Sequence, residues 1–129
     1  STGDAWYRAL KAPAWQPPDW VFGLIWPYNF VMLGLTALRV AQKLSRPLVL
    51  TWLISLAISI LFALMWAYHF YVPHNLNFAA ISLGLAALFT IPLLIIAYKV
   101  SWQIGLLLTP YQIWVTIATT LAWGYAVRN

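Results

Sequence analysis

An antiparallel bundle of transmembrane α-helices is the fold class that this sequence predicts, and three observations support it. Of the 129 residues, 64% are hydrophobic and only 7% are charged, whereas about a quarter of the residues in a soluble domain are charged. The charged residues are separated by long uncharged stretches. A proline-containing turn signal divides the longest of these stretches. The chain is therefore expected to form one all-α, multi-pass membrane domain over residues 1–129.

The lengths of the uncharged stretches define the membrane spans. They hold 19 residues after Asp19, 52 residues after Arg46 and 28 residues after Lys99. A helix crosses a bilayer with about 20 residues. The longest stretch therefore contains two helices, which separate at residues 72–75, because Pro73 lacks an amide donor and restricts the residue before it. We expect four spans joined by short loops that make neighbours antiparallel, at about residues 20–40, 48–71, 76–98 and 104–127.

The first span has a distinct start signal. Pro17 and Pro18 cannot continue a helix backward, and Asp19 is expected to be the N-cap, with its carboxylate accepting first-turn amides. At the other end of the span, Arg39 and Lys43 mark the return to the membrane surface.

The seven basic residues are spread along the chain rather than clustered. A nucleic-acid partner requires a basic patch on one surface, so none is expected, and membrane lipids are the expected surroundings. The basic residues divide four to three between the two sides of the bundle, which is too small a difference to fix the orientation.

On two of the expected spans, aromatic residues recur at helical spacing and so share one face of the helix. Phe22, Trp26, Asn29 and Leu33 share one face of the first span, and a second face on the last span holds Tyr111, Trp114, Ala118, Leu121 and Tyr125. Such faces arise from ordinary packing, in which small residues let helices approach closely. They also arise where aromatic side chains line a ligand cavity, and spacing leaves both interpretations open.

The sequence offers little for ordinary enzyme chemistry. It has no cysteine and no glutamate, and Asp4 and Asp19 are its two acidic residues. His69 and His74 are five residues apart across a proline, which does not suit a metal-binding pair on one helix, so neither a metal site nor a set of catalytic residues is predicted. No ionisable residue is expected within a span, which makes a small-solute transporter the least favoured function.

Three segments resemble the TspO/MBR family of tryptophan-rich sensory and translocator proteins. They are "WYRALKAPAWQPPDWVFGLIW" at 6–26, "ALRVAQ" at 37–42 and "GLLLTPYQIWVTIATTLAW" at 105–123. The resemblance implies a five-span fold, in which residues 1–18 form the loop after the first family helix. This chain then carries four of the five spans, with a genuine four-helix relative as the alternative. A multi-pass protein of a bacterial inner membrane or an organelle membrane is implied.

The resemblance also implies a cavity between the helices with residues 1–18 as its lid. Family members bind tetrapyrroles such as protoporphyrin there, and animal members bind cholesterol and synthetic drugs. Carried over by residue, the lining would be Tyr7, Pro17, Trp26, Tyr111, Trp114 and Ala118, with Asn29, Ser59, Phe62 and Leu121 as further candidates.

The sequence departs from the family pattern at polar positions. Where members commonly have Asn followed by Trp, this chain aligns Ser59 and Phe62; an acidic residue is replaced near Ser82, and an Asn is replaced near Ala122. A more apolar cavity suits a ligand without a carboxylate. A sterol-like lipid, a carotenoid or a chlorophyll-type pigment such as an esterified chlorin therefore stands beside protoporphyrin as the expected ligand.

Two functions follow from these expectations. The first is binding of a flat hydrophobic ligand, with a transport or regulatory role; porphyrin degradation at Trp26 and Trp114 would be implied by the resemblance alone. The second is a structural or pigment-associated subunit of a larger membrane complex, such as a photosynthetic one, with a degenerate pocket. The expected protein partner is accordingly a second copy, in a homodimer, or the other subunits of that complex.

Overall fold

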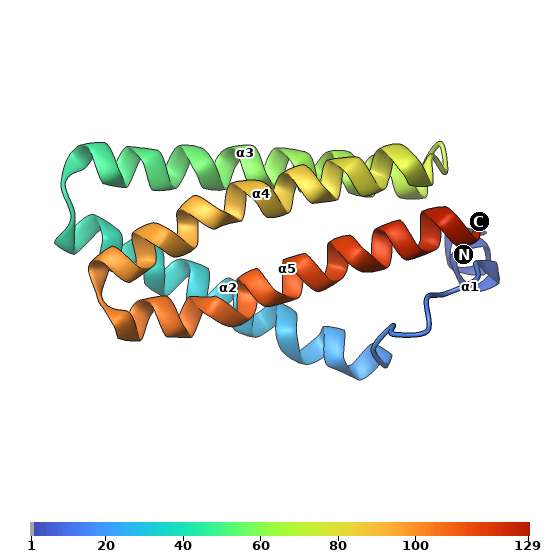
Figure 1. Cartoon of the computed structure of the whole chain (residues 1–129), viewed down its shortest axis with the longest axis horizontal. Coiled ribbons are helices and arrows are strands. Elements are labelled where there is room, and N and C mark those ends of the chain that lie inside the picture. The colour runs from blue at the N-terminus through green and yellow to red at the C-terminus, as the bar shows by residue number, and fades with distance from the viewer. Residues whose placement is uncertain (1) are drawn as a thin grey trace.

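The computed structural model of the chain describes residues 2–129, with side chains from residue 5 onward, and it is built from five α-helices (Figure 1). Four of these are long and apolar enough to cross a membrane, which confirms the predicted all-helical membrane bundle. The helices are α1 (Thr2–Ala9), α2 (Asp19–Lys43), α3 (Arg46–Tyr71), α4 (Leu76–Val100) and α5 (Trp102–Arg128).

The segment before the first span differs from the expected loop, because residues 2–9 form helix α1. The helix turns Trp6 and Tyr7 toward the bundle, where they pack with Leu10 against Phe70 and Tyr125. Burial of these aromatic rings provides the tertiary support that a helix of two turns lacks on its own.

The start of α2 corrects a second expectation. Pro18 is the N-cap, with an extended backbone at φ −59° and ψ 153°, and no side chain caps the helix. Asp19 is the first helical residue instead. Its carboxylate still lies in the first turn, where it interacts favourably with the helix dipole, and the proline before it fixes the direction in which the chain enters the membrane.

The two tight turns are stabilised by side-chain caps. Asn75 is the last residue of the break at residues 72–75, and its side-chain oxygen accepts a hydrogen bond from the Phe78 amide at 3.0 Å. Ser101 accepts one from the Ile104 amide at 3.1 Å. Each cap satisfies an otherwise unpaired first-turn amide. Because the connections are short, α3, α4 and α5 run antiparallel to their neighbours.

Packing is uneven along the bundle. Helices α3 and α4, and likewise α4 and α5, lie against each other along their length, whereas α2 makes fewer contacts. A core at the α2–α3 loop includes Val40, Trp52, Leu93 and Leu108, and the Trp52 indole donates to the Leu93 carbonyl at 3.2 Å. From that end, α2 and α3 diverge toward α1 and the end of α5 (Figure 1).

Residues 10–18 run across this wider end and attach to the last turns of α5. The Pro13 ring is buried against Gly124, where a side chain would overlap it. The Trp15 indole donates to the Thr120 hydroxyl at 3.2 Å. Asn129 forms two hydrogen bonds with the backbone of Lys11, at 3.0 and 3.1 Å. We call residues 2–18 the lid, because these contacts place them over the space between the diverging helices.

Candidate ligand cavity

A cavity of about 980 Å³ occupies the wide half of the bundle, between α2, α3, α4 and α5, with lid residues at its end. Its volume is at the upper end of the roughly 300–1,000 Å³ that small-molecule sites occupy. Seven of the ten residues that the sequence identified lie in its lining: Tyr7, Trp26, Ser59, Tyr111, Trp114, Ala118 and Leu121.

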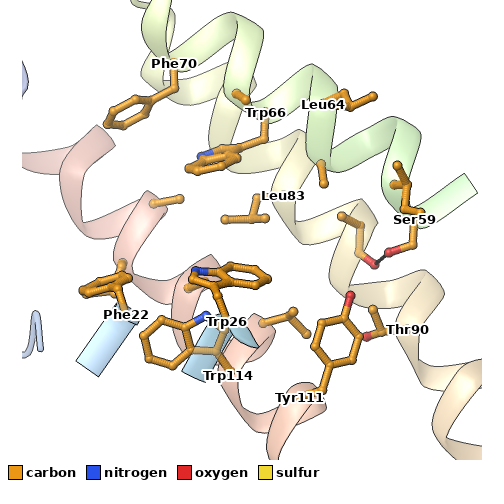
Figure 2. Close-up of a pocket in the computed structure, with 18 of the residues that line it drawn as sticks. Phe22, Trp26, Ser59, Leu64, Trp66, Phe70, Leu83, Thr90, Tyr111 and Trp114 are labelled. Atoms are coloured by element: carbon orange, nitrogen blue, oxygen red, sulfur yellow. Dashed lines mark hydrogen bonds between the residues drawn. The ribbon is translucent and has the colours of Figure 1, made fainter. Parts of the chain in front are cut away.

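Indole and phenyl rings from α2 and α5 form one wall. Trp114 is 5% exposed and Trp26 is 36% exposed, and their ring centroids are 6.4 Å apart at an interplanar angle of 89°. Phe22 meets Trp114 edge-on at 5.0 Å. The two faces predicted from helical spacing therefore meet (Figure 2). Edge-to-face packing of this kind holds the rings in fixed orientations.

The opposite wall comes from α3, and sequence reasoning missed most of it. Trp66 and Phe70 face the Trp26–Trp114 pair across the cavity, with Leu83 of α4 between the two walls (Figure 2). Ser59 lies on the same face of α3. A signal existed, because residues 59, 63, 66 and 70 have the spacing of four, three and four that was recognised on the other two helices.

The lid end of the cavity is polar. The Tyr125 hydroxyl donates to the Gln16 side-chain oxygen and lies 3.3 Å from the Tyr7 hydroxyl. Gln16 also donates to Tyr7 at 3.4 Å. This triad connects α1, the loop after it and α5. Arg8 and Asp19 line the same end of the cavity, so any charged group of a ligand would meet its nearest charged partners here.

The inner end of the cavity, farthest from the lid, carries uncharged hydroxyl groups. Ser59 donates to the Ala86 carbonyl at 2.7 Å, and Thr90 donates to the Ala87 carbonyl at 2.6 Å. Tyr111 extends toward these two side chains from α5 (Figure 2). The cavity therefore has a polar lid end, which we call the mouth, aromatic walls and a neutral polar inner end, which we call the floor. It also has an open side between α2 and α3, where the lining residues Phe30, Ile60 and Leu64 are exposed.

Three residues from the predicted set lie outside the lining. Pro17 is half-buried in the lid. Phe62 stacks on Phe89 of α4, with centroids 5.9 Å apart, because it lies about 60° around α3 from Ser59. Asn29 is fully buried within the packed part of α2, and its amide has no hydrogen-bond partner among the described residues.

The remaining chemistry-bearing side chains lie away from the cavity. His74 stacks on Trp6 with ring centroids 3.6 Å apart, and neither it nor His69 contributes to the lining. Within residues 5–129, no group of three or more His, Cys, Asp and Glu side chains is placed to hold a metal ion. The arrangement is suited to enclosing an apolar molecule.

Comparison with known proteins fits this geometry. The TspO/MBR family profile matches residues 1–128. The chain belongs to the TspO/MBR family. It is 32% identical to the protein named CrtK from Rhodobacter capsulatus, over 91% of the chain and 74% of that protein. Identity to a tryptophan-rich sensory protein from Cereibacter sphaeroides is 31%, over 92% and 73% of the two chains. The translocator protein of Homo sapiens shares 28% identity, over 92% and 72%.

As a TspO/MBR protein, the chain is an integral membrane protein with four apolar helices that can span the bilayer. Trp26 and Trp114, which belong to two of the segments that resemble the family, both line the cavity.

Proposed function

We propose that this TspO/MBR protein binds a flat hydrophobic ligand, such as a tetrapyrrole or a sterol-like lipid, in the tryptophan-lined cavity beneath the lid. The supporting observation is a cavity of about 980 Å³ that is walled on opposite sides by Trp114 and Trp66. A flat apolar ligand between these walls gains about 25 cal/mol for each Å² of apolar surface that it buries. Each aromatic contact adds about 0.5–1.5 kcal/mol. A transport or regulatory role would follow from loading and release through the lid.

The alternative function is a structural or pigment-associated subunit of a larger membrane complex. A bundle that serves only as a scaffold gains from close packing of its interior. The cavity works against that gain, since large rings such as Trp66 and Phe70 surround space instead of filling it. Ligand binding is therefore the better supported of the two functions.

A titration with protoporphyrin tests the proposal. The purified chain in detergent or nanodiscs is titrated while tryptophan emission and the porphyrin Soret band are followed. Energy transfer to a porphyrin reaches tryptophans throughout so small a bundle, so the affinity is the informative quantity and the amplitude of quenching is not. Binding is expected to be saturable, and Trp114→Leu is expected to weaken it about five- to thirtyfold, which corresponds to about 1–2 kcal/mol.

Trp102→Leu is the matched control, because Trp102 lies on the same helix, is 64% exposed and is absent from the lining. It should lower the total emission and leave the affinity unchanged. Equal affinities for native protein and both variants would contradict binding in this cavity. If neither a porphyrin nor a sterol binds the folded protein, and it is stable only together with other proteins, the subunit function is supported instead.

A further inference from the structure

The hydroxyl groups at the inner end of the cavity lie deep in the membrane. Ser59 is near the middle of the 26-residue α3, and Thr90 is near the middle of the 25-residue α4. Tyr111 lies about 14 Å along α5 from its first residue, at about 1.5 Å per residue. With a hydrocarbon core of about 30 Å, all three groups lie at the depth of that core.

Two of these hydroxyls already have acceptors for their protons. Ser59 and Thr90 both donate to backbone carbonyls of α4. The Thr90 oxygen also lies 2.6 Å from the side-chain amide oxygen of Gln112. A hydroxyl has one proton, so this second contact is best satisfied with the amide turned to donate its N–H to Thr90. Neither side chain retains a free donor.

Tyr111 differs from both. It lines the cavity, it extends toward Ser59 and Thr90 (Figure 2), and its hydroxyl forms no hydrogen bond with any residue that the structure describes. A hydroxyl that faces the cavity without a protein partner can donate to a ligand oxygen that reaches it. Among the described lining residues, the indole N–H groups of Trp66 and Trp114 in the walls are also unpaired. Tyr111 is the unpaired donor at the floor, where the neighbouring Ser59 oxygen keeps lone pairs that can accept.

The mouth of the cavity has the opposite character. There the hydroxyls of Tyr7 and Tyr125 are paired with each other and with Gln16. The charged residues Arg8 and Asp19 line the same end, and Asp19 is the first residue of the α2 span. A carboxylate is tolerated at this end. It would be unpaired at the inner end, because no lining residue there is charged, and burying an unpaired charge is prohibitive.

We infer that Tyr111 is a specificity-determining residue that selects ligands with an uncharged oxygen, a hydroxyl or a carbonyl, at the end that enters the cavity first. The inference rests on the proposed function and adds a ligand orientation to it. The neutral oxygen accepts from the Tyr111 hydroxyl, a ligand hydroxyl donates in turn to the Ser59 or Thr90 oxygen, and any ionised group stays at the mouth beside Arg8.

The test uses two probes that differ only in this oxygen: dehydroergosterol, which carries a 3-hydroxyl, and its 3-deoxy analogue. Both contain a conjugated triene that accepts energy from tryptophan, so binding to the purified chain is measured by the same signal. The quantity of interest is the ratio of the two dissociation constants. A ratio cancels any general loss of affinity or of folded protein that a substitution causes.

The native chain is expected to prefer the hydroxyl probe about five- to thirtyfold, the range for one hydrogen bond in a desolvated site. Tyr111→Phe should reduce this ratio to near one, mainly by weakening binding of the hydroxyl probe. Tyr28→Phe is the matched control, because the Tyr28 hydroxyl donates to the Leu107 carbonyl at 2.7 Å and does not line the cavity. Tyr125→Phe removes a hydroxyl at the mouth, and both variants should keep the native ratio.

The outcomes separate this inference from the proposed function. A native ratio near one, or a ratio that survives Tyr111→Phe, overturns the role of Tyr111 and leaves cavity binding standing. If the ratio falls to near one in Tyr125→Phe instead, the sterol hydroxyl binds at the mouth, and the role of Tyr111 is again overturned. If protoporphyrin binds and neither sterol does, the selection of an uncharged oxygen by Tyr111 is contradicted, and ligand binding in the cavity still stands. If no probe binds, both proposals are rejected.

Discussion

Replacing Gly124 by alanine is expected to release the lid from α5. A Cβ atom at this position would overlap the Pro13 ring and lie 3.1 Å from Cζ2 of Trp15. The substitution does not weaken α5 itself, because alanine is favoured over glycine in a helix by about 1 kcal/mol. Overpacking costs about 1–3 kcal/mol, and the lid can relieve it by moving away. The ratio of open to closed lid should therefore rise about five- to 150-fold.

Limited trypsin digestion measures this opening. In the closed lid, the Lys11 amide donates to the Asn129 side chain and the Lys11 carbonyl accepts from it. The peptide bond after Lys11 is thus held in place, and cleavage requires the lid to detach. When opening and closing are fast compared with cleavage, the cleavage rate follows the open population. Gly124→Ala should accelerate cleavage after Lys11 by the same factor.

Gly34→Ala provides the control, since a Cβ atom there meets nothing within 4 Å. It makes the same chemical change inside a membrane helix and should leave the cleavage rate at its native value. Equal cleavage rates for Gly124→Ala and Gly34→Ala would refute the idea that Pro13 seated against Gly124 holds the lid.

Three further substitutions have expected outcomes. Thr120→Val removes the hydroxyl that accepts a hydrogen bond from the Trp15 indole. Trypsin cleavage after Lys11 should accelerate about two- to tenfold, the effect expected for loss of one exposed hydrogen bond. An unchanged cleavage rate would show that this bond does not hold the lid. Gly105→Ala should destabilise the bundle by about 1–3 kcal/mol, because its Cβ would overlap the Tyr98 ring, and a melting temperature equal to that of Gly34→Ala would contradict this. Asn29→Leu should raise the melting temperature, because it removes a buried amide that has no partner among the described residues, and such a group costs about 1–3 kcal/mol of stability. A lower melting temperature would indicate that the amide is hydrogen-bonded in solution.

The sequence predicted the spans well because their signals are local. Uncharged length and the break at Pro73 require no knowledge of the neighbouring helices. The same holds for the cavity faces of α2 and α5, where aromatic residues recur at helical spacing. In α5 these residues alternate with hydroxyl-bearing side chains such as Thr116 and Thr120, so the face stands out from its surroundings.

The face of α3 was harder to recognise because apolar residues surround that helix on every side. Ser59 is the one hydroxyl-bearing residue among positions 59, 63, 66 and 70, so polarity only weakly distinguishes the side that carries Trp66 from the side that meets lipid. Asn29 shows the converse limit, since periodicity places it on the cavity face of α2 while packing buries it completely. Spacing determines the direction of a side chain, and the angle between helices determines whether space remains in front of it.

Helix α5 contributes both to the cavity wall and to the anchoring of the lid, and kinetics can separate these roles. Trp114 and Tyr111 face the ligand space, whereas Gly124 and Thr120 hold lid residues. If a ligand enters and leaves only when the lid is open, Gly124→Ala raises the association and dissociation rates together and changes the dissociation constant little. Tyr111→Phe and Trp114→Leu leave the association rate near its native value and raise the dissociation rate, as changes inside an interface usually do. A Gly124→Ala variant with a native association rate would mean that ligands reach the cavity by a route that bypasses the lid.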